Sequence, residues 1–130
     1  MSEIRSHIII NAAADEVWRI VGDAPNIADW MPSMNESVGD ADQRTVTLAS
    51  GSKLVEDIVT NDSARRRLQY RVVGGDLPVT GHLGTVDVLP ITDRQTIVVY
   101  STELGPSELA AAFDEAISGG LANLKKVVES

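Results

Sequence analysis

Apolar and polar residues alternate along most of the chain, and this period of two is typical of β-strands with one buried face. The alternation predicts seven strands, at residues 4–11, 35–38, 44–49, 53–60, 67–73, 79–89 and 95–104. Gly, Asn, Asp and Ser gather in the short segments between the last six, where they favour tight turns. Strands joined by short turns pair antiparallel, so the sequence predicts an antiparallel meander.

Near the C-terminal end the apolar spacing changes to three and four residues, which predicts a long amphipathic helix over residues 106–130. Gly105 is expected as its N-cap and Pro106 as its first helical residue. The apolar stripe of this helix consists of Leu109, Phe113, Ile117, Leu121, Leu124 and Val128. Two short helices are expected after the first strand, at residues 12–21 and 25–32.

These elements predict an α+β fold in which one long helix lies across a strongly bent sheet. At about 1.5 Å per residue the helix is longer than any of the strands, so it has to cross the sheet diagonally. Its apolar stripe then packs on the concave face, and a cavity is expected between helix and sheet. A chain of 130 residues suffices for one core, so residues 1–130 are expected to form a single domain.

Composition and charge restrict the partners. A net charge of −8 at pH 7 argues against nucleic acid or an anionic membrane surface, because both attract a basic face. The single basic cluster, Arg65 to Arg67, is expected to be a solvated turn. There is no cysteine for a disulfide or a thiolate zinc site, and no apolar run approaches the ~20 residues of a membrane span. We therefore expect a cytoplasmic protein with no metal and no cofactor, while a homodimer or a protein partner stays open.

Alternation also assigns side chains to the two faces of individual strands. Tyr70 lies on the same face of its strand as its apolar neighbours. Tyr100 lies on the face of its strand that does not carry the charged Glu103. Both tyrosines are therefore expected to face the cavity. Placing Asp87 outward puts His82 inside as well. His7 falls opposite the apolar face of its strand and is expected at the surface.

Several short motifs follow one another along essentially the whole chain. They are INA at 10–12, VW at 17–18, DAPNIADWMP at 23–32, LVEDI at 54–58, RRLQYRVVGG at 66–75 and GTVDV at 84–88. In this order they resemble the START-like helix-grip superfamily (SRPBCC, or birch-pollen allergen type, Bet v 1-like), and within it the bacterial polyketide cyclase/dehydrase-like branch. The resemblance implies a strongly bent seven-stranded antiparallel sheet wrapped around a long C-terminal helix, with two short helices after the first strand.

The same order is similar to that of the plant abscisic-acid receptors, and this resemblance implies that Glu56 and His82 face a ligand cavity. Periodicity alone leaves Glu56 undecided, because its strand carries charges on both faces. Leu77 and Pro78 stand where the receptors have polar residues in a closing loop, so hormone-type gating is not expected. No basic side chain falls among the positions assigned inward, and a neutral ligand with hydroxyl or carbonyl groups is therefore expected.

Glu56 and His82 are the one pair of side chains in the expected cavity that could carry out acid–base chemistry. Burial raises the pKa of a carboxyl and lowers that of an imidazole, whereas a close pair shifts both the other way, so their protonation depends on their separation. Three interpretations stay open: hydrogen bonds to a ligand, proton transfer in a cyclisation or dehydration, and a purely structural role in the core.

The residues expected to contact a ligand lie on the inner face, at the pocket rim and on the long helix: Trp30, Met34, Glu56, Tyr70, His82, Tyr100, Phe113 and Ile117. Trp30 fits the rim and core packing equally well. The cavity favours binding or carriage of a small apolar ligand, lipid-like or polycyclic. One alternative is an enzyme of the polyketide cyclase/dehydrase type, with Glu56 and His82 as catalytic groups and Tyr70 or Tyr100 polarising a carbonyl. Another is a regulatory or stress-associated module that acts through a protein partner.

Overall fold

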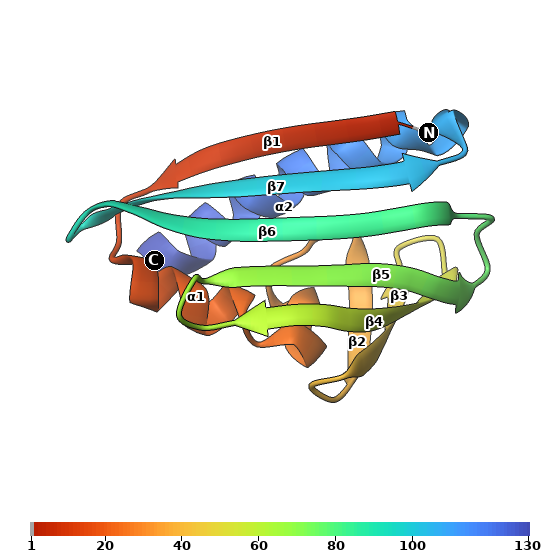
Figure 1. The fold of residues 1–130 in the computed structure, drawn as a ribbon, viewed down its shortest axis with the longest axis horizontal. Helices are drawn as coiled ribbons and strands as arrows, with labels where there is room; N and C mark the ends of the chain where they lie inside the picture. The colour runs from red at the N-terminus through yellow and green to blue at the C-terminus, as the bar shows by residue number, and fades with distance from the viewer. Residues whose placement is uncertain (1) are drawn as a thin grey trace.

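The computed structural model describes residues 2–130, and its elements follow the predicted order (Figure 1). The strands are β1 Ser2–Ile10, β2 Met34–Gly39, β3 Gln43–Leu48, β4 Lys53–Asp62, β5 Arg67–Gly75, β6 Thr80–Thr92 and β7 Gln95–Gly105. A short helix, α1 Ala14–Val21, and a 3₁₀ segment, η1 Ala24–Asp29, follow β1. The chain ends with the 3₁₀ turn η2 Ser107–Leu109 and the long helix α2 Ala110–Glu129.

All seven strands form one antiparallel sheet in the order β1-β7-β6-β5-β4-β3-β2. Strands β2 to β7 are a meander, and β1 joins it by pairing with β7 from Ser2 opposite Leu104 to Ile10 opposite Thr96. The sheet curls around α2, which lies behind β1, β7 and β6 in Figure 1. The predicted helix-grip fold is thus confirmed.

The ladder between β5 and β6 is short. It runs only from Arg67 opposite Asp87 to Tyr70 opposite Gly84, although both strands continue beyond these residues. At the same end of the sheet the pairing of β6 with β7 is also irregular, because its register shifts between Thr80 and Leu83. Strands β5 and β6 therefore separate at the end of the sheet where their inner side chains meet the cavity.

Helix α2 has two parts with different roles. At about 1.5 Å per residue its 20 residues span about 30 Å, and it packs mainly along β1. In its C-terminal part Leu121 and Leu124 are buried in the core with the inner faces of the strands. The N-terminal part, with Phe113 and Ile117, borders a cavity instead.

The start of α2 differs from the prediction. Gly105 is not an N-cap but the last residue of β7, where it pairs with Thr80 of β6. Pro106 precedes the 3₁₀ turn η2, and the α-helix begins only at Ala110. The sheet ladder holds the chain extended through Gly105, so the α-helix starts four residues later than the predicted first residue, Pro106. Likewise α1 begins at Ala14 rather than at residue 12.

Gly120 has a packing role in α2. A Cβ at this position would lie 2.5 Å from the sulfur of Met31, so the absent side chain lets the helix approach the segment that follows η1. A Cβ on Gly119 would meet nothing within 4 Å. Close approach of the segment after η1 therefore accounts for the glycine at position 120, but not for the one at 119.

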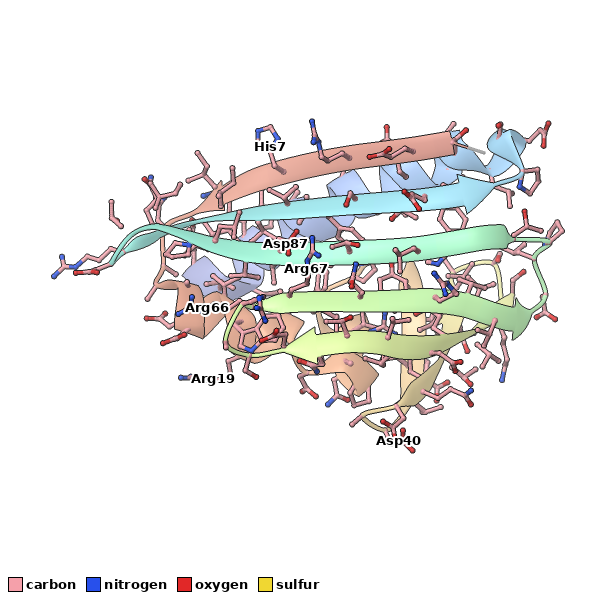
Figure 2. The ribbon with its side chains drawn as sticks, in the orientation of Figure 1. His7, Arg19, Asp40, Arg66, Arg67 and Asp87 are labelled. Atoms are coloured by element: carbon pink, nitrogen blue, oxygen red, sulfur yellow. The ribbon has the colours of Figure 1, made fainter. Side chains whose placement is uncertain are left out.

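The basic cluster lies in the turn between β4 and β5 and at the first residue of β5. Each of its three guanidiniums lies 2.8 Å from a carboxylate oxygen: Arg65 with Asp62, Arg66 with Asp15 and Arg67 with Asp87. Figure 2 shows the last pair side by side on neighbouring strands, and His7 pointing away from β1 into solvent.

Within residues 2–130 no helix is both long and apolar enough to cross a membrane.

Candidate functional site

A cavity of about 400 Å³ lies between the concave face of the sheet and the N-terminal part of α2. Its walls are mostly apolar, and seven of the eight side chains expected at a ligand line it: Met34, Glu56, Tyr70, His82, Tyr100, Phe113 and Ile117. The remaining lining residues, which were not among those expected at a ligand, are Met31, Ser33, Leu48, Ala49, Ser50, Leu54, Leu77, Leu109, Ala112 and Ala116. The period-two assignment of inward faces therefore located the cavity wall on β5, β6 and β7.

Trp30 lies behind this wall rather than in it. Its side chain is 1% exposed, its ring centroid is 6.4 Å from that of Tyr100, and it does not line the cavity. Its backbone carbonyl accepts a hydrogen bond from Asn123 of α2, so the segment after η1 is held against the helix. Of the two roles open for Trp30, the structure assigns core packing, and the neighbouring Met31 takes the place at the cavity.

Glu56 is buried at the cavity wall and is paired with an arginine. Its Oε1 accepts a hydrogen bond from Nε of Arg44 at 2.8 Å, and the two side chains are 3% and 0% exposed. Arg44 also donates from Nη1 to the carbonyl of Ala24 at 2.8 Å. Burial raises the pKa of the Glu56 carboxyl, and the adjacent Arg44 charge and its hydrogen bond oppose that rise.

Arg44 overturns the expectation that no basic side chain faces inward. It lies on β3 two residues before Val46, which is fully buried, and it pairs directly across the sheet with Glu56 of β4. Alternation from Val46 is the signal that would have placed Arg44 inside. A charged residue at an inward position is rare unless it is paired, and the register that supplies its partner cannot be read from one strand.

Tyr70 and Tyr100 join their hydroxyls in the interior, and either oxygen can be the donor. Their rings meet edge to face at a centroid distance of 6.4 Å, and the Arg44 guanidinium carbon lies 4.6 Å from the centre of the Tyr70 ring. A Cβ on Gly84 would lie within 2.6 Å of two carbons of that ring, so Tyr70 can occupy this place only beside a glycine. Burial raises the pKa of both phenols, that of Tyr100 to about 12, so both hydroxyls are protonated at neutral pH.

His82 bridges the gap between β5 and β6. Its Nδ1 accepts a hydrogen bond from the backbone N–H of Val72 at 3.1 Å, beyond the last ladder pair of the two strands. Burial lowers the pKa of His82 to about 4, and the charges of Arg71 and Arg44 act in the same direction. The imidazole is therefore neutral at pH 7. Because Nδ1 is an acceptor, the proton resides on Nε2, which takes part in no hydrogen bond within residues 2–130.

The arrangement differs from an acid–base pair. Glu56 is bonded to Arg44 and His82 to a backbone amide, and no hydrogen bond within residues 2–130 joins the two side chains. Glu56 and His82 remain polar groups in the same cavity wall. Among the same residues, no cluster of three or more His, Asp or Glu side chains is placed to hold a metal ion.

The lowered pKa of His82 predicts a pH-dependent stability. The unfolded chain binds a proton at His82 below about pH 6.5, whereas the folded protein resists protonation until about pH 4. The free energy of unfolding should therefore fall as the pH drops through this window, by up to about 1.4 kcal/mol per pH unit. Urea denaturation at several pH values between 7 and 4 measures this change in the free energy of unfolding.

His82→Asn is the control for this measurement. The Asn carbonyl oxygen can replace Nδ1 as the acceptor for Val72, but it does not titrate. The variant should lack the part of the pH dependence that belongs to His82. Parallel stability profiles of parent and variant over this window would contradict the role assigned to burial of the imidazole.

Comparisons with known proteins agree with this fold and cavity. No curated protein sequence matches the chain. Similar solved structures include XoxI from Bacillus cereus, with a TM-score of 0.93 and 21% identity over 100% of this chain and 97% of that one. The Zhui aromatase/cyclase from Streptomyces sp. R1128 has a TM-score of 0.82 and 16% identity over 98% of this chain and 93% of its own. Norcoclaurine synthase from Thalictrum flavum, in complex with dopamine and hydroxybenzaldehyde, has a TM-score of 0.76 and 20% identity over 98% and 86%.

At these identities the solved structures establish the fold alone, and the family is shown by the match of a sequence model. The sequence model described as "Polyketide cyclase / dehydrase and lipid transport" matches residues 1–129, which is nearly the whole chain. The resemblance of the short motifs is thereby confirmed at the level of the family. The chain belongs to the polyketide cyclase/dehydrase and lipid transport family.

Proposed function

We propose that this protein binds a small, largely apolar guest with a few polar groups in the cavity between the sheet and α2. The observation that carries the proposal is the cavity of about 400 Å³, which lies within the usual size range of small-molecule sites. Apolar walls with a small number of placed polar groups are the ordinary composition of such sites. Membership of a family named for cyclases, dehydrases and lipid transport supports ligand binding or cyclase chemistry.

Apart from Ser33 and Ser50, the polar lining residues lie on the sheet side of the cavity. Glu56, Tyr70, His82 and Tyr100 come from β4, β5, β6 and β7, whereas α2 contributes only apolar side chains such as Phe113 to the wall. A polycyclic or lipid-like guest would therefore lie with its apolar face on α2 and its oxygen atoms towards the strands.

Binding without turnover fits these side chains better than acid–base catalysis. A general base works best when its pKa lies near the operating pH, and the pKa of His82 is lowered to about 4. Glu56 already accepts a hydrogen bond from Arg44. Neither group has the partner that would tune it for proton transfer at neutral pH.

Cyclase chemistry is the second candidate, and the paired tyrosines favour it. Two hydroxyls that share one hydrogen bond leave one O–H proton unused, so the Tyr70–Tyr100 pair can donate to a guest carbonyl. A donor placed on a carbonyl oxygen stabilises the negative charge that develops there during enolisation or aldol closure.

Filling the cavity should weaken guest binding. Ile117→Trp replaces a lining side chain of α2 with a larger one, and we expect the affinity for 2-naphthol, measured by titration calorimetry, to fall about tenfold or more because the indole occupies guest volume. Ala122→Trp introduces the same indole on the exposed side of the same helix and should bind as the parent does.

The outcomes separate the two candidates. Equal affinity in the parent and in Ile117→Trp would place the guest elsewhere and contradict the proposal. Conversion of a poly-β-ketone by the parent, detected by mass spectrometry of the products, would instead favour the cyclase. Native mass spectrometry of freshly purified protein checks for a retained guest.

A further inference from the structure

The Glu56 carboxylate is engaged on one oxygen only. Oε1 accepts from Arg44, whereas Oε2 has no hydrogen-bond partner within residues 2–130. Oε2 is also not among the fully enclosed atoms that lack a partner, which are Trp30 Nε1, Arg44 Nη2 and Thr102 Oγ1. Because Glu56 lines the cavity, Oε2 is the carboxylate oxygen that faces the guest space.

Arg44 is fixed from several sides. It lies directly opposite Glu56 in the β3–β4 register, it donates to the carbonyl of Ala24, and its guanidinium lies against the ring of Tyr70. Its side chain is 0% exposed. A side chain held in this way presents Nε to Glu56 in one orientation and cannot follow a guest.

We infer that Arg44 is a positioning residue: it fixes Glu56 as an ionised hydrogen-bond acceptor in the cavity wall, so that the cavity selects guests that donate a hydrogen bond from a hydroxyl. The inference rests on the proposed function, because it needs a guest in the cavity. It adds to the proposed function a requirement that the apolar walls do not impose, namely that the guest carries a hydroxyl donor.

The charges around Glu56 support this assignment. Arg44 from β3 is the cation in contact with it. Tyr70 from β5 and Tyr100 from β7 are protonated phenols, and the negative charge of Glu56 contributes to raising their pKa. His82 from β6 lines the same cavity and is neutral at pH 7. An ionised acceptor forms stronger hydrogen bonds to hydroxyl donors than a neutral one does, whereas a guest ether or carbonyl oxygen would leave Oε2 unpaired.

Two naphthalenes of similar size test the selectivity. The parent should bind 2-naphthol about tenfold more tightly than 2-methoxynaphthalene, which cannot donate a hydrogen bond. In Glu56→Gln the preference should disappear or reverse. Arg44 still donates from Nε, so the amide must turn its oxygen to Arg44 and its NH₂ group to the cavity. An unchanged preference for 2-naphthol in this variant would overturn the inference.

A second measurement needs no guest. The pKa of Glu56, followed by carbon NMR of the side-chain carboxyl, should rise by about one unit or more in Arg44→Gln, because the opposing charge is lost. Arg67→Gln, which removes a guanidinium of the convex face, should leave that pKa unchanged. If Arg44→Gln does not fold, Arg44→Lys replaces it: an ammonium cannot hold both Ala24 and Glu56 in the fork geometry, so the selectivity for 2-naphthol should weaken.

The two measurements separate this inference from the proposed function. A pKa of Glu56 that does not respond to Arg44→Gln would overturn the role of Arg44 even if both naphthalenes bind. A raised pKa together with no binding of either naphthalene would support Arg44 as the residue that sets the charge of Glu56 and would contradict the proposed function.

Discussion

Arg44→Met is expected to lower the free energy of unfolding by about 3–5 kcal/mol, because it leaves the Glu56 carboxylate buried without its counter-charge. Both side chains are almost wholly enclosed, at 0% and 3% exposure, so solvent cannot replace the lost partner. The hydrogen bond to the carbonyl of Ala24 is lost as well. Guanidinium chloride denaturation of parent and variant measures the difference.

Arg67→Met is the matched control. Arg67 is also 2.8 Å from a carboxylate, that of Asp87, but its side chain is 44% exposed on the convex face. Exposed pairs contribute about 0–1 kcal/mol, so this variant should be nearly as stable as the parent. Removing both partners of the buried pair, in Arg44→Met with Glu56→Met, should restore most of the loss, since an apolar pair of similar volume leaves no unpaired charge. Equal losses in Arg44→Met and Arg67→Met would contradict the burial argument.

Leu124→Ala should cost about 2–5 kcal/mol of stability. Leu124 is 0% exposed in the C-terminal part of α2, where the helix closes the core, and truncation there leaves a cavity that the surrounding strands cannot fill. Val127→Ala lies on the same turns of the helix but removes a side chain that is 38% exposed, and it should change stability by about 0.5 kcal/mol or less. Thermal or chemical denaturation gives both values, and a loss in Leu124→Ala no larger than in Val127→Ala would show that α2 does not anchor the core there.

Most of the fold follows from periodicity. Alternation in the strands and the three- and four-residue spacing in α2 are determined by burial of one face, so the element order and the inward positions of Tyr70 and Tyr100 could be predicted. The start of α2 could not, because the pairing of Gly105 with Thr80 is a long-range contact that overrides the local cap signals. Such contacts depend on register, which a single strand does not encode.

The candidate site was predictable only in part for the same reason. The pattern identified Glu56 and His82 as inward polar groups with the help of a family resemblance, but their partners depend on which residues of neighbouring strands stand opposite. Arg44 was missed because a charge is usually assigned outward. The sequence left Trp30 open between the rim and the core, because its distance from the cavity depends on packing between η1 and α2.

The hydrogen bond between His82 and the Val72 amide changes how substitutions at position 82 have to be interpreted. In an ordinary ladder the partner of a backbone N–H is another backbone group, which no substitution removes. In the gap between β5 and β6 the partner of the Val72 N–H is instead the side chain of His82, which also lines the cavity. His82→Ala would therefore disturb the sheet and the guest space together, and a loss of binding in that variant would not identify a guest contact. Asn retains an acceptor for Val72 while deleting the Nε2 donor, and it is the substitution that tells the two contributions apart.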